Sequence, residues 1–391
     1  MSSIAENWKL LSGEKNWEGL LEPLDLNLRR YLIHYGERAG ATTDNFIADE
    51  KSKNCGLPRF AKRHLFSQVG LENGNPFSYK VTRYLYATSE VSVAGNSNCM
   101  GYVAVSTDLG SAVLGRRDIM VAWRGTMRHV EWVINAMAVL VSGSKILGSP
   151  NGVDPLVHLG WYSLYTTAEE GSTLNSMSCR DQVLEEVRKL VDTYKDEEIS
   201  ITITGHSLGA ALATLNAADI VANGFNRPTS HPEKACLVTA FAFASPRVGN
   251  KDFRTLVSDL GVYLHVLRIT NLLDPVPKLP PSIPFFKYVD VGEELVVDAT
   301  KSPYRRENSV QYHGLELYLH AIAGTHGPQG QGKFKLEVKR DIALLNKYSS
   351  DLKEEYLVIS SWWVAKNTSM VQKDDGFWVL MDHERDEDGF F

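Results

Sequence analysis

The chain has 391 residues, of which 43% are hydrophobic and 23% charged, and its formal net charge is −6 at pH 7. These proportions are ordinary for a soluble globular protein and leave room for one large domain or two average ones. The negative charge and the lack of a basic cluster argue against a nucleic-acid partner. For the same reason we expect any membrane contact to be peripheral and mostly apolar.

We expect neither a targeting segment nor a metal-binding motif in this sequence. It has no apolar segment near its first residue and no run approaching ~20 apolar residues. Its four cysteines are scattered and lack metal-ligand spacing. We therefore expect a cytoplasmic protein with reduced thiols, and neither a metal nor an organic cofactor.

In chain order, the pattern predicts a helical region followed by an alternating core. Residues 1–79 carry leucines at near-helical spacing, which favours helices that cover a sheet over the alternative, a face for substrate or a partner. Residues 80–330 alternate β-branched runs with amphipathic segments such as 179–194, which predicts a mostly parallel sheet with helices on both faces. Strands are expected at 80–87, 101–106, 118–123, 198–204, 237–244 and 263–269, with a further hairpin at 285–297.

The remaining residues, 331–391, are predicted to be an extension of the same single domain. Alternation between residues 352 and 380 favours strands. The charged run 382–388 is expected to be a solvated, mobile tail.

The stretch Gly205-His206-Ser207-Leu208-Gly209 lies where a β-branched run, 198–204, gives way to an alanine-rich helical run. A G-x-S-x-G in that setting is typical of a nucleophile elbow, in which a sharp turn presents the serine. The amide of Leu208, at the start of the helix, would then face a developing oxyanion. The alternative is a purely structural turn. We favour Ser207 as a nucleophile.

Asp274 is the candidate acid, because it follows a predicted strand at the edge where α/β sheets place their active sites. The prolines after it would fix its loop. On its own, Asp274 before Pro275 would indicate an Asx turn instead.

Two histidines compete for the role of base. A base must reach the serine with one ring nitrogen and the acid with the other, which suits a loop or a helix start. His313 directly precedes a helical run, whereas His320 lies two turns further inside it. We therefore favour His313. The weaker candidates are His158, His265 and His326.

Together, Ser207, the proline-rich loop after Asp274, and His313 resemble the filamentous-fungal class 3 lipases, and more closely the plant class II phospholipase A1 proteins. One departure is that the fungal histidine is followed closely by an aromatic pair, whereas here Tyr318 comes later, near His320. Further segments that resemble the family are 17–25, 120–126, 131–132, 158–161, 244–250, 361–364 and 375–380.

The resemblance implies an α/β-hydrolase fold of the class 3 lipase type, with the amide of Thr126 joining Leu208 in the oxyanion hole. It also bears on residues 130–141, which are apolar on almost every side and fit either a buried core helix or a lid over an acyl groove. The fungal enzymes carry their lid here, so we favour a lid near 127–150. The expected acyl-contacting residues are Trp132, Val133, Met137 and Leu140.

The implied activity is hydrolysis of fatty-acyl esters of glycerolipids at a membrane or droplet surface. The resemblance points to the sn-1 ester of phospholipids, with mono- and diacylglycerols or galactolipids as other substrates. One alternative is a catalytically silent signalling scaffold, disfavoured because such proteins carry long helical C-terminal extensions. The other is a thioesterase or acyltransferase, disfavoured by the lid-like segment and the acid loop.

Overall fold

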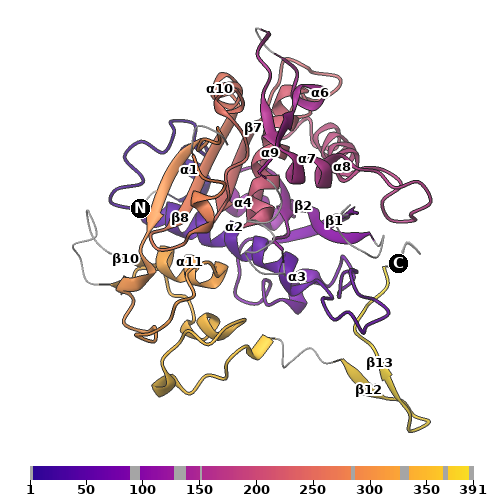
Figure 1. The fold of residues 1–391 in the computed structure, drawn as a ribbon, viewed down its shortest axis with the longest axis vertical. Coiled ribbons are helices and arrows are strands. Elements are labelled where there is room, and N and C mark those ends of the chain that lie inside the picture. Colours follow the sequence, from indigo (N-terminus) through magenta and orange to yellow (C-terminus); the bar gives the residue numbers. More distant parts are fainter. Residues whose placement is uncertain are drawn as a thin grey trace.

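A seven-stranded sheet forms the centre of the protein (Figure 1). The computed structural model describes residues 3–88, 97–126, 138–149, 152–282, 287–325, 334–363 and 369–386. The strand order is β1-β2-β3-β6-β7-β8-β9. All neighbours from β3 to β9 are parallel, while β1 and β2 run antiparallel at one end. The strands are β1 (Tyr79–Ala87), β2 (Asn98–Ser106), β3 (Arg117–Trp123), β6 (Ile199–His206), β7 (Leu237–Phe243), β8 (Leu264–Asn271) and β9 (Glu293–Val297).

Helices cover both faces of the sheet, so the predicted mostly parallel α/β architecture is confirmed. In Figure 1, α7, α8 and α10 lie above the sheet, and α3 and α11 lie below it. One layer contains α6 (Ser144–Leu147), α7 (Leu159–Thr166), α8 (Cys179–Thr193), α9 (Leu208–Ala222) and α10 (Lys251–Asp259). The other contains α1 (Ile4–Leu11), α2 (Leu26–Asp44), α3 (Leu65–Gln68), α4 (Asp108–Leu114) and α11 (Leu315–Ala323).

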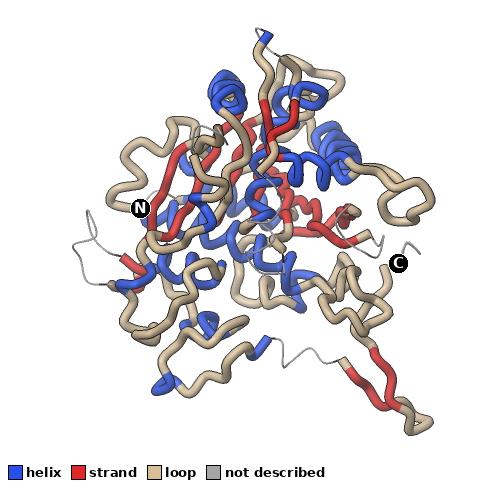
Figure 2. The backbone as a smooth tube through the Cα atoms, in the orientation of Figure 1, coloured by secondary structure: helices blue, strands red, loops and turns tan. Residues whose placement is uncertain are grey.

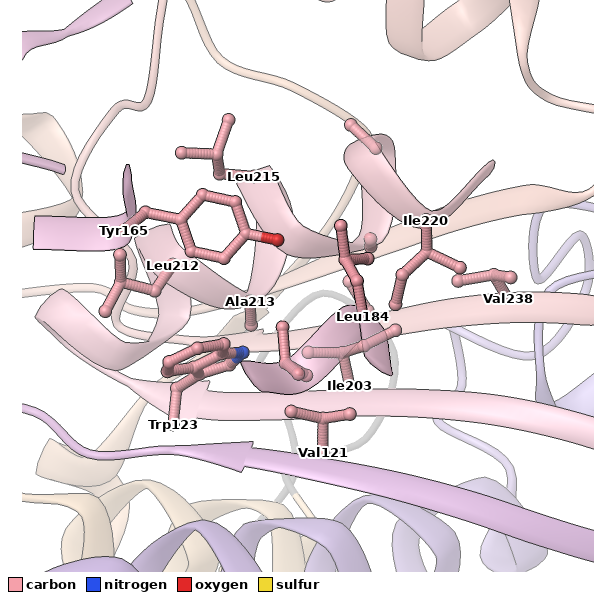
Figure 3. Packing of buried hydrophobic residues seen from close by; sticks show 14 of the residues in the cluster. Val121, Trp123, Tyr165, Leu184, Ile203, Leu212, Ala213, Leu215, Ile220 and Val238 are labelled. Carbon is pink, nitrogen blue, oxygen red and sulfur yellow. The ribbon is translucent and has the colours of Figure 1, made fainter. Parts of the chain in front are cut away.

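Helix α9 is almost entirely buried, because it is packed on all sides. It contacts β3, β6, β7 and β8 of the sheet and, beside them, α6 and α7. In Figure 3, Leu212 and Ala213 of α9 lie with Trp123 and Ile203 of the strands and with Tyr165 of α7. An apolar helix of this kind is stable only inside a core, so the helix that follows Ser207 is held rigidly.

On the opposite face, a buried carboxylate attaches α2 to the sheet. Asp118 of β3 accepts hydrogen bonds on Oδ1 from Ser200 Oγ (2.7 Å) and Thr202 Oγ1 (2.8 Å) of β6. Its Oδ2 accepts from the hydroxyls of Tyr35 in α2 (2.9 Å) and Tyr79 in β1 (2.6 Å). Four donors from three elements thus meet at one side chain.

The positive partner of this carboxylate is Arg116, which is also fully buried. Its Nη2 lies 3.4 Å from Asp118 Oδ1 and donates to the Tyr35 hydroxyl (2.9 Å) and to that of Tyr31. A buried charge pair is tolerated only when its polar atoms are satisfied. The cluster therefore fixes α2 on the sheet without leaving an unpaired charge.

The C-terminal part is mostly loop (Figure 2). Among its described residues are the 3-10 turns Ile342–Asn346 and Glu354–Tyr356 and the hairpin of β12 (Met370–Gln372) and β13 (Trp378–Leu380). Two other short pairs are β4 (Leu140–Ser142) with β5 (Leu156–His158) and β10 (Gly324–Thr325) with β11 (Lys335–Leu336). In the described part of the chain, no helix is both long and apolar enough to cross a bilayer.

The prediction of a mobile charged tail is wrong for residues 382–386. Asp382 is buried and accepts hydrogen bonds from Ser52 Oγ (2.6 Å) and Asn54 Nδ2 (2.7 Å). Asp386 Oδ1 accepts from the amide of Lys62 (2.7 Å). The acidic residues are therefore held by donors on an N-terminal loop, which charge composition alone does not reveal.

The predicted hairpin at 285–297 is also wrong in its described part. The strand there, β9, pairs in parallel with β8 at the sheet edge. Before it, Val289 makes an isolated bridge to Gly249. Alternating apolar residues are common to hairpins and to edge strands of mixed sheets, so periodicity could not separate the two.

We expect the substitution Asp118→Ala to lower the free energy of unfolding by ~3–5 kcal/mol, because it leaves Arg116 buried without its counter-ion. Urea unfolding followed by circular dichroism measures this. The control is Asp108→Ala, which breaks the 2.7 Å ion pair of Arg117 with the solvent-exposed Asp108 and should have little effect. Equal losses in the two variants would contradict the role given to the Asp118 cluster.

Candidate active site

Ser207 is located on a strained turn between β6 and α9. Its backbone has φ 58° and ψ −125°, a region that non-glycine residues rarely adopt. The turn is held by a hydrogen bond from the Ser207 amide to the carbonyl of Phe243 (2.9 Å). A Cβ atom on Gly205 would lie 2.3 Å from the Gly209 carbonyl oxygen, so only glycine fits there. The arrangement is that of the predicted elbow.

Asp274 lies three residues after β8 and is buried. Its Oδ1 accepts a hydrogen bond from the amide of Val276 (2.9 Å), which is the local turn that the sequence offered as an alternative. Its Oδ2 lies 2.7 Å from His313 Nδ1. The turn and the contact with His313 therefore coexist, with one oxygen used for each.

His313 lies on the loop that leads into α11. Its Nδ1 faces Asp274, and its Nε2 lies 2.8 Å from Ser207 Oγ. The structure thus brings the three predicted residues together in one hydrogen-bonded chain. In the neutral tautomer that donates from Nδ1, Nε2 accepts the serine proton, which is the geometry a general base requires.

The competing candidates that the structure describes, His320, His158 and His265, have other partners. His320 is buried in α11, where Nε2 lies 2.7 Å from Ser302 Oγ and the ring stacks on Phe334. His158 Nδ1 caps α7 by accepting from the Gly160 amide (2.9 Å). His265 packs against Trp17, and His326 lies outside the described residues.

Tyr318 is a supporting residue whose role the sequence did not indicate. Its hydroxyl donates to Asp274 Oδ2 (2.6 Å) and accepts from the Asn271 amide (3.1 Å). Burial, together with the neighbouring Asp274, raises the pKa of Tyr318 well above its ordinary value. The phenol therefore keeps its proton and fixes the carboxylate that faces His313.

His206 and Asn271 hold the backbone of the loop that carries His313, residues 302–314, which we call the histidine loop. His206 Nε2 donates to the His313 carbonyl (2.7 Å), and Asn271 Nδ2 donates to the Tyr312 carbonyl (2.9 Å). Burial, reinforced by His313, lowers the pKa of His206 to about 3, so this imidazole is neutral at physiological pH. His206 stands inside the serine motif, but its partner is apparent only in three dimensions.

Of the two predicted oxyanion residues, Leu208 directly follows Ser207, and Thr126 directly follows Gly125, which packs on the elbow. Leu208 is the first residue of α9, and Thr126 follows β3 by three residues. A Cβ on Gly125 would lie 2.8 Å from the His206 carbonyl oxygen and 3.6 Å from Ser207 Cβ, so this loop packs directly on the elbow. Buried Arg124 donates from Nη1 to the Gly125 carbonyl (2.9 Å), which orients the loop.

The structure describes residues 138–149 of the lid predicted near 127–150. Trp132, Val133 and Met137 lie outside the described residues, and their role stays a prediction. Leu140 is half-buried on the strand β4, opposite His158, so the helix expected over 130–141 does not extend to its C-terminal end. Among the described residues there is no group of three or more histidine, cysteine or acidic side chains able to hold a metal ion.

The sequence matches known proteins along nearly its whole length. The family model for lipase (class 3) matches residues 120–283. The chain is 48% identical to Phospholipase A1-IIgamma of Arabidopsis thaliana, over 98% of this chain and 94% of that protein. It is 48% identical to Phospholipase A1-II 6 of rice, Oryza sativa subsp. japonica, over 98% and 97%. The chain belongs to the class 3 lipase family.

The chain is also similar to solved structures of lower sequence identity. The LIP2 lipase of Yarrowia lipolytica is 19% identical, with 71% of this chain and 82% of that one covered and a TM-score of 0.48. The resemblance to class 3 lipases and to the plant phospholipase A1 group, stated from sequence motifs, is confirmed by the family match and the plant relatives.

In a class 3 lipase with this geometry, we expect His313→Ala to lower kcat by about 10³-fold or more, because nucleophile and base act as a unit. His320→Gln, which keeps a partner for Ser302, should retain kcat within a few fold. Hydrolysis of a soluble short-chain ester by the purified variants measures both. A silent His320→Gln enzyme beside an active His313→Ala enzyme would reverse the assignment.

The low pKa of His206 makes stability depend on pH. Below pH 6.5 the unfolded chain gains a proton at this histidine, whereas the folded chain does not until about pH 3. The free energy of unfolding therefore falls with acidification by at most about 1.4 kcal/mol per pH unit for this group. His206→Gln, which can still donate to the His313 carbonyl, should flatten that slope between pH 6 and 4 in urea titrations. An unchanged slope would contradict the lowered pKa of His206.

Proposed function

We propose that this protein is a serine acylhydrolase of the phospholipase A1 type. The observation that carries the proposal is the hydrogen-bonded chain from Ser207 through His313 to Asp274, with contacts of 2.8 and 2.7 Å. The names of the plant relatives, which are phospholipases A1, support the same class of reaction.

In the proposed reaction, Ser207 Oγ attacks the acyl carbonyl of the lipid while His313 Nε2 takes its proton. Asp274 holds the imidazole in the right tautomer and stabilises its cation. The amides of Leu208 and Thr126 stabilise the tetrahedral oxyanion, a contribution typically worth about 10²–10³ in rate for each donor. His313 then passes the proton to the leaving lysolipid, and water releases the fatty acid from Ser207.

Exposed apolar residues close in sequence to Asp274 and His313 support a lipid substrate. Leu272 and Leu273, directly before Asp274, are about half exposed, and Val310, three residues before His313, is 82% exposed. Exposed apolar side chains next to a reaction centre are favoured where the partner is itself apolar. The substrate we propose is the sn-1 ester of a phospholipid, with mono- and diacylglycerols or galactolipids as further substrates.

We expect vesicles of phosphatidylcholine labelled separately in the two acyl chains to lose the sn-1 label first. A fluorophosphonate probe should label one site, and Ser207→Ala should abolish both labelling and hydrolysis, because Ser207 combines an elbow with a base. Thin-layer chromatography and in-gel fluorescence measure the two. Hydrolysis that survives Ser207→Ala would refute the mechanism, whereas release of the sn-2 label first would refute only the position of cleavage.

A further inference from the structure

The segment that carries His313 has no regular secondary structure of its own. It runs from the 3-10 turn Ala299–Lys301 to α11 as an irregular loop. Three successive carbonyls on this loop are nevertheless each held by a side chain. The Gln311 carbonyl accepts from Arg305 Nη2 (3.1 Å), that of Tyr312 from Asn271 Nδ2 (2.9 Å), and that of His313 from His206 Nε2 (2.7 Å).

Two of these contacts tie the loop to the other reacting residues. His206 is adjacent to Ser207 in the elbow, and Asn271 lies three residues before Asp274. They therefore set the position of His313 relative to the nucleophile and the acid. The third contact, from Arg305, connects the loop to a different part of the molecule.

Arg305 is fixed by an acidic residue from the C-terminal part of the chain. Its Nε and Nη2 donate to Asp351 Oδ2 (2.8 Å) and Oδ1 (3.1 Å), and both side chains are nearly completely buried. The guanidinium also lies over the ring of Tyr312, 5.3 Å from its centroid. A two-point contact of this kind fixes the plane of the guanidinium as well as its position.

Asp351 is itself held by the backbone around it. Its amide donates to Asn346 Oδ1 (2.9 Å), and its carbonyl accepts from the Arg306 amide (2.9 Å). Arg306 Nε donates to the Leu352 carbonyl (3.0 Å). The histidine loop and residues 351–352 are thus joined along both backbone and side chains.

We infer that Asp351 and Arg305 are positioning residues for the reaction, acting on His313 through the Gln311 carbonyl. The inference rests on the proposed function. Because the pair is buried, we assign it no contact with lipid. The segment matched by the family model, residues 120–283, contains Ser207 and Asp274 but neither His313 nor Asp351. On this inference, the C-terminal part of the chain helps to position His313 in the active site.

The reason is geometric. Without the Asp351 carboxylate, Arg305 loses the contacts that fix its plane, and Nη2 no longer holds the Gln311 carbonyl. His313 is two residues away, and a displacement of about 1 Å at a reacting group can cost about 10²-fold in rate. Because neither Arg305 nor Asp351 contacts the substrate, their substitution should lower kcat and leave KM unchanged.

The test uses the full chain with Asp351→Asn, Arg305→Lys and Arg305→Met, assayed on a soluble short-chain ester. We expect Asp351→Asn and Arg305→Met to lower kcat by about 10- to 100-fold with KM within twofold. Arg305→Lys keeps the charge but cannot hold Asp351 and Gln311 together, so it should fall between these variants and the wild type. The rate of fluorophosphonate labelling at Ser207 should fall in parallel, because it needs the same base.

Arg180→Gln is the matched control. It breaks another two-point pair, in which Arg180 Nε and Nη2 donate to Asp219 at 2.7 and 2.9 Å, away from the histidine loop. Thermal unfolding shows which variants are folded. If Asp351→Asn and Arg305→Met do not fold, the milder Arg305→Lys still tests the inference. In folded variants, unchanged kcat, a rise in KM alone, or an equal kcat loss in Arg180→Gln would overturn the inference. Wild-type protein without Ser207-dependent activity would instead overturn the proposed function.

Discussion

At three glycines the backbones of neighbouring segments are in direct contact. The part of the sheet that carries Ser207 depends on this close approach. A Cβ on Gly209 would lie 2.3 Å from the Trp123 carbonyl oxygen, and one on Gly205 would meet Gly209 at the same distance. A Cβ on Gly125 would lie 2.8 Å from the carbonyl oxygen of His206, which also belongs to the elbow. Because glycine has no side chain, β3, β6 and α9 can converge closely enough to place Ser207 beside the loop after β3. Any larger residue would separate Ser207 from the residues proposed to form the oxyanion hole.

The same strands carry strain at one end and a satisfied polar cluster at the other. Ser207, with its positive φ, follows the last residue of β6. Ser200 and Thr202, near the start of β6, donate to the buried Asp118. Unfavourable backbone geometry persists only where its surroundings hold it in place. The firmly attached α2 on one face and the fully packed α9 on the other supply that support.

The features predicted correctly from the sequence are those that a local sequence pattern determines. Strands with β-branched runs were placed nearly at their observed bounds, and Ser207 and Asp274 were recognisable because each follows a buried strand at a turn. His313 was favoured over His320 by its loop position. Tyr318, which fixes Asp274 across 44 positions, has no local signal of its partner. The edge strand β9 and the anchored Asp382 were misread for the same reason, since both depend on neighbours distant in sequence.

The contacts between the two ends of the chain affect how it folds during synthesis. Asp44, buried at the end of α2, finds its partner Lys347 across 303 positions, and the amide of Lys62 finds Asp386 across 324. A ribosome therefore exposes the N-terminal helices, with buried polar groups still unpaired, long before their partners emerge. Contacts of such long range slow folding and leave incomplete chains prone to association. A chaperone that binds nascent chains would find its substrate in the first third of this protein.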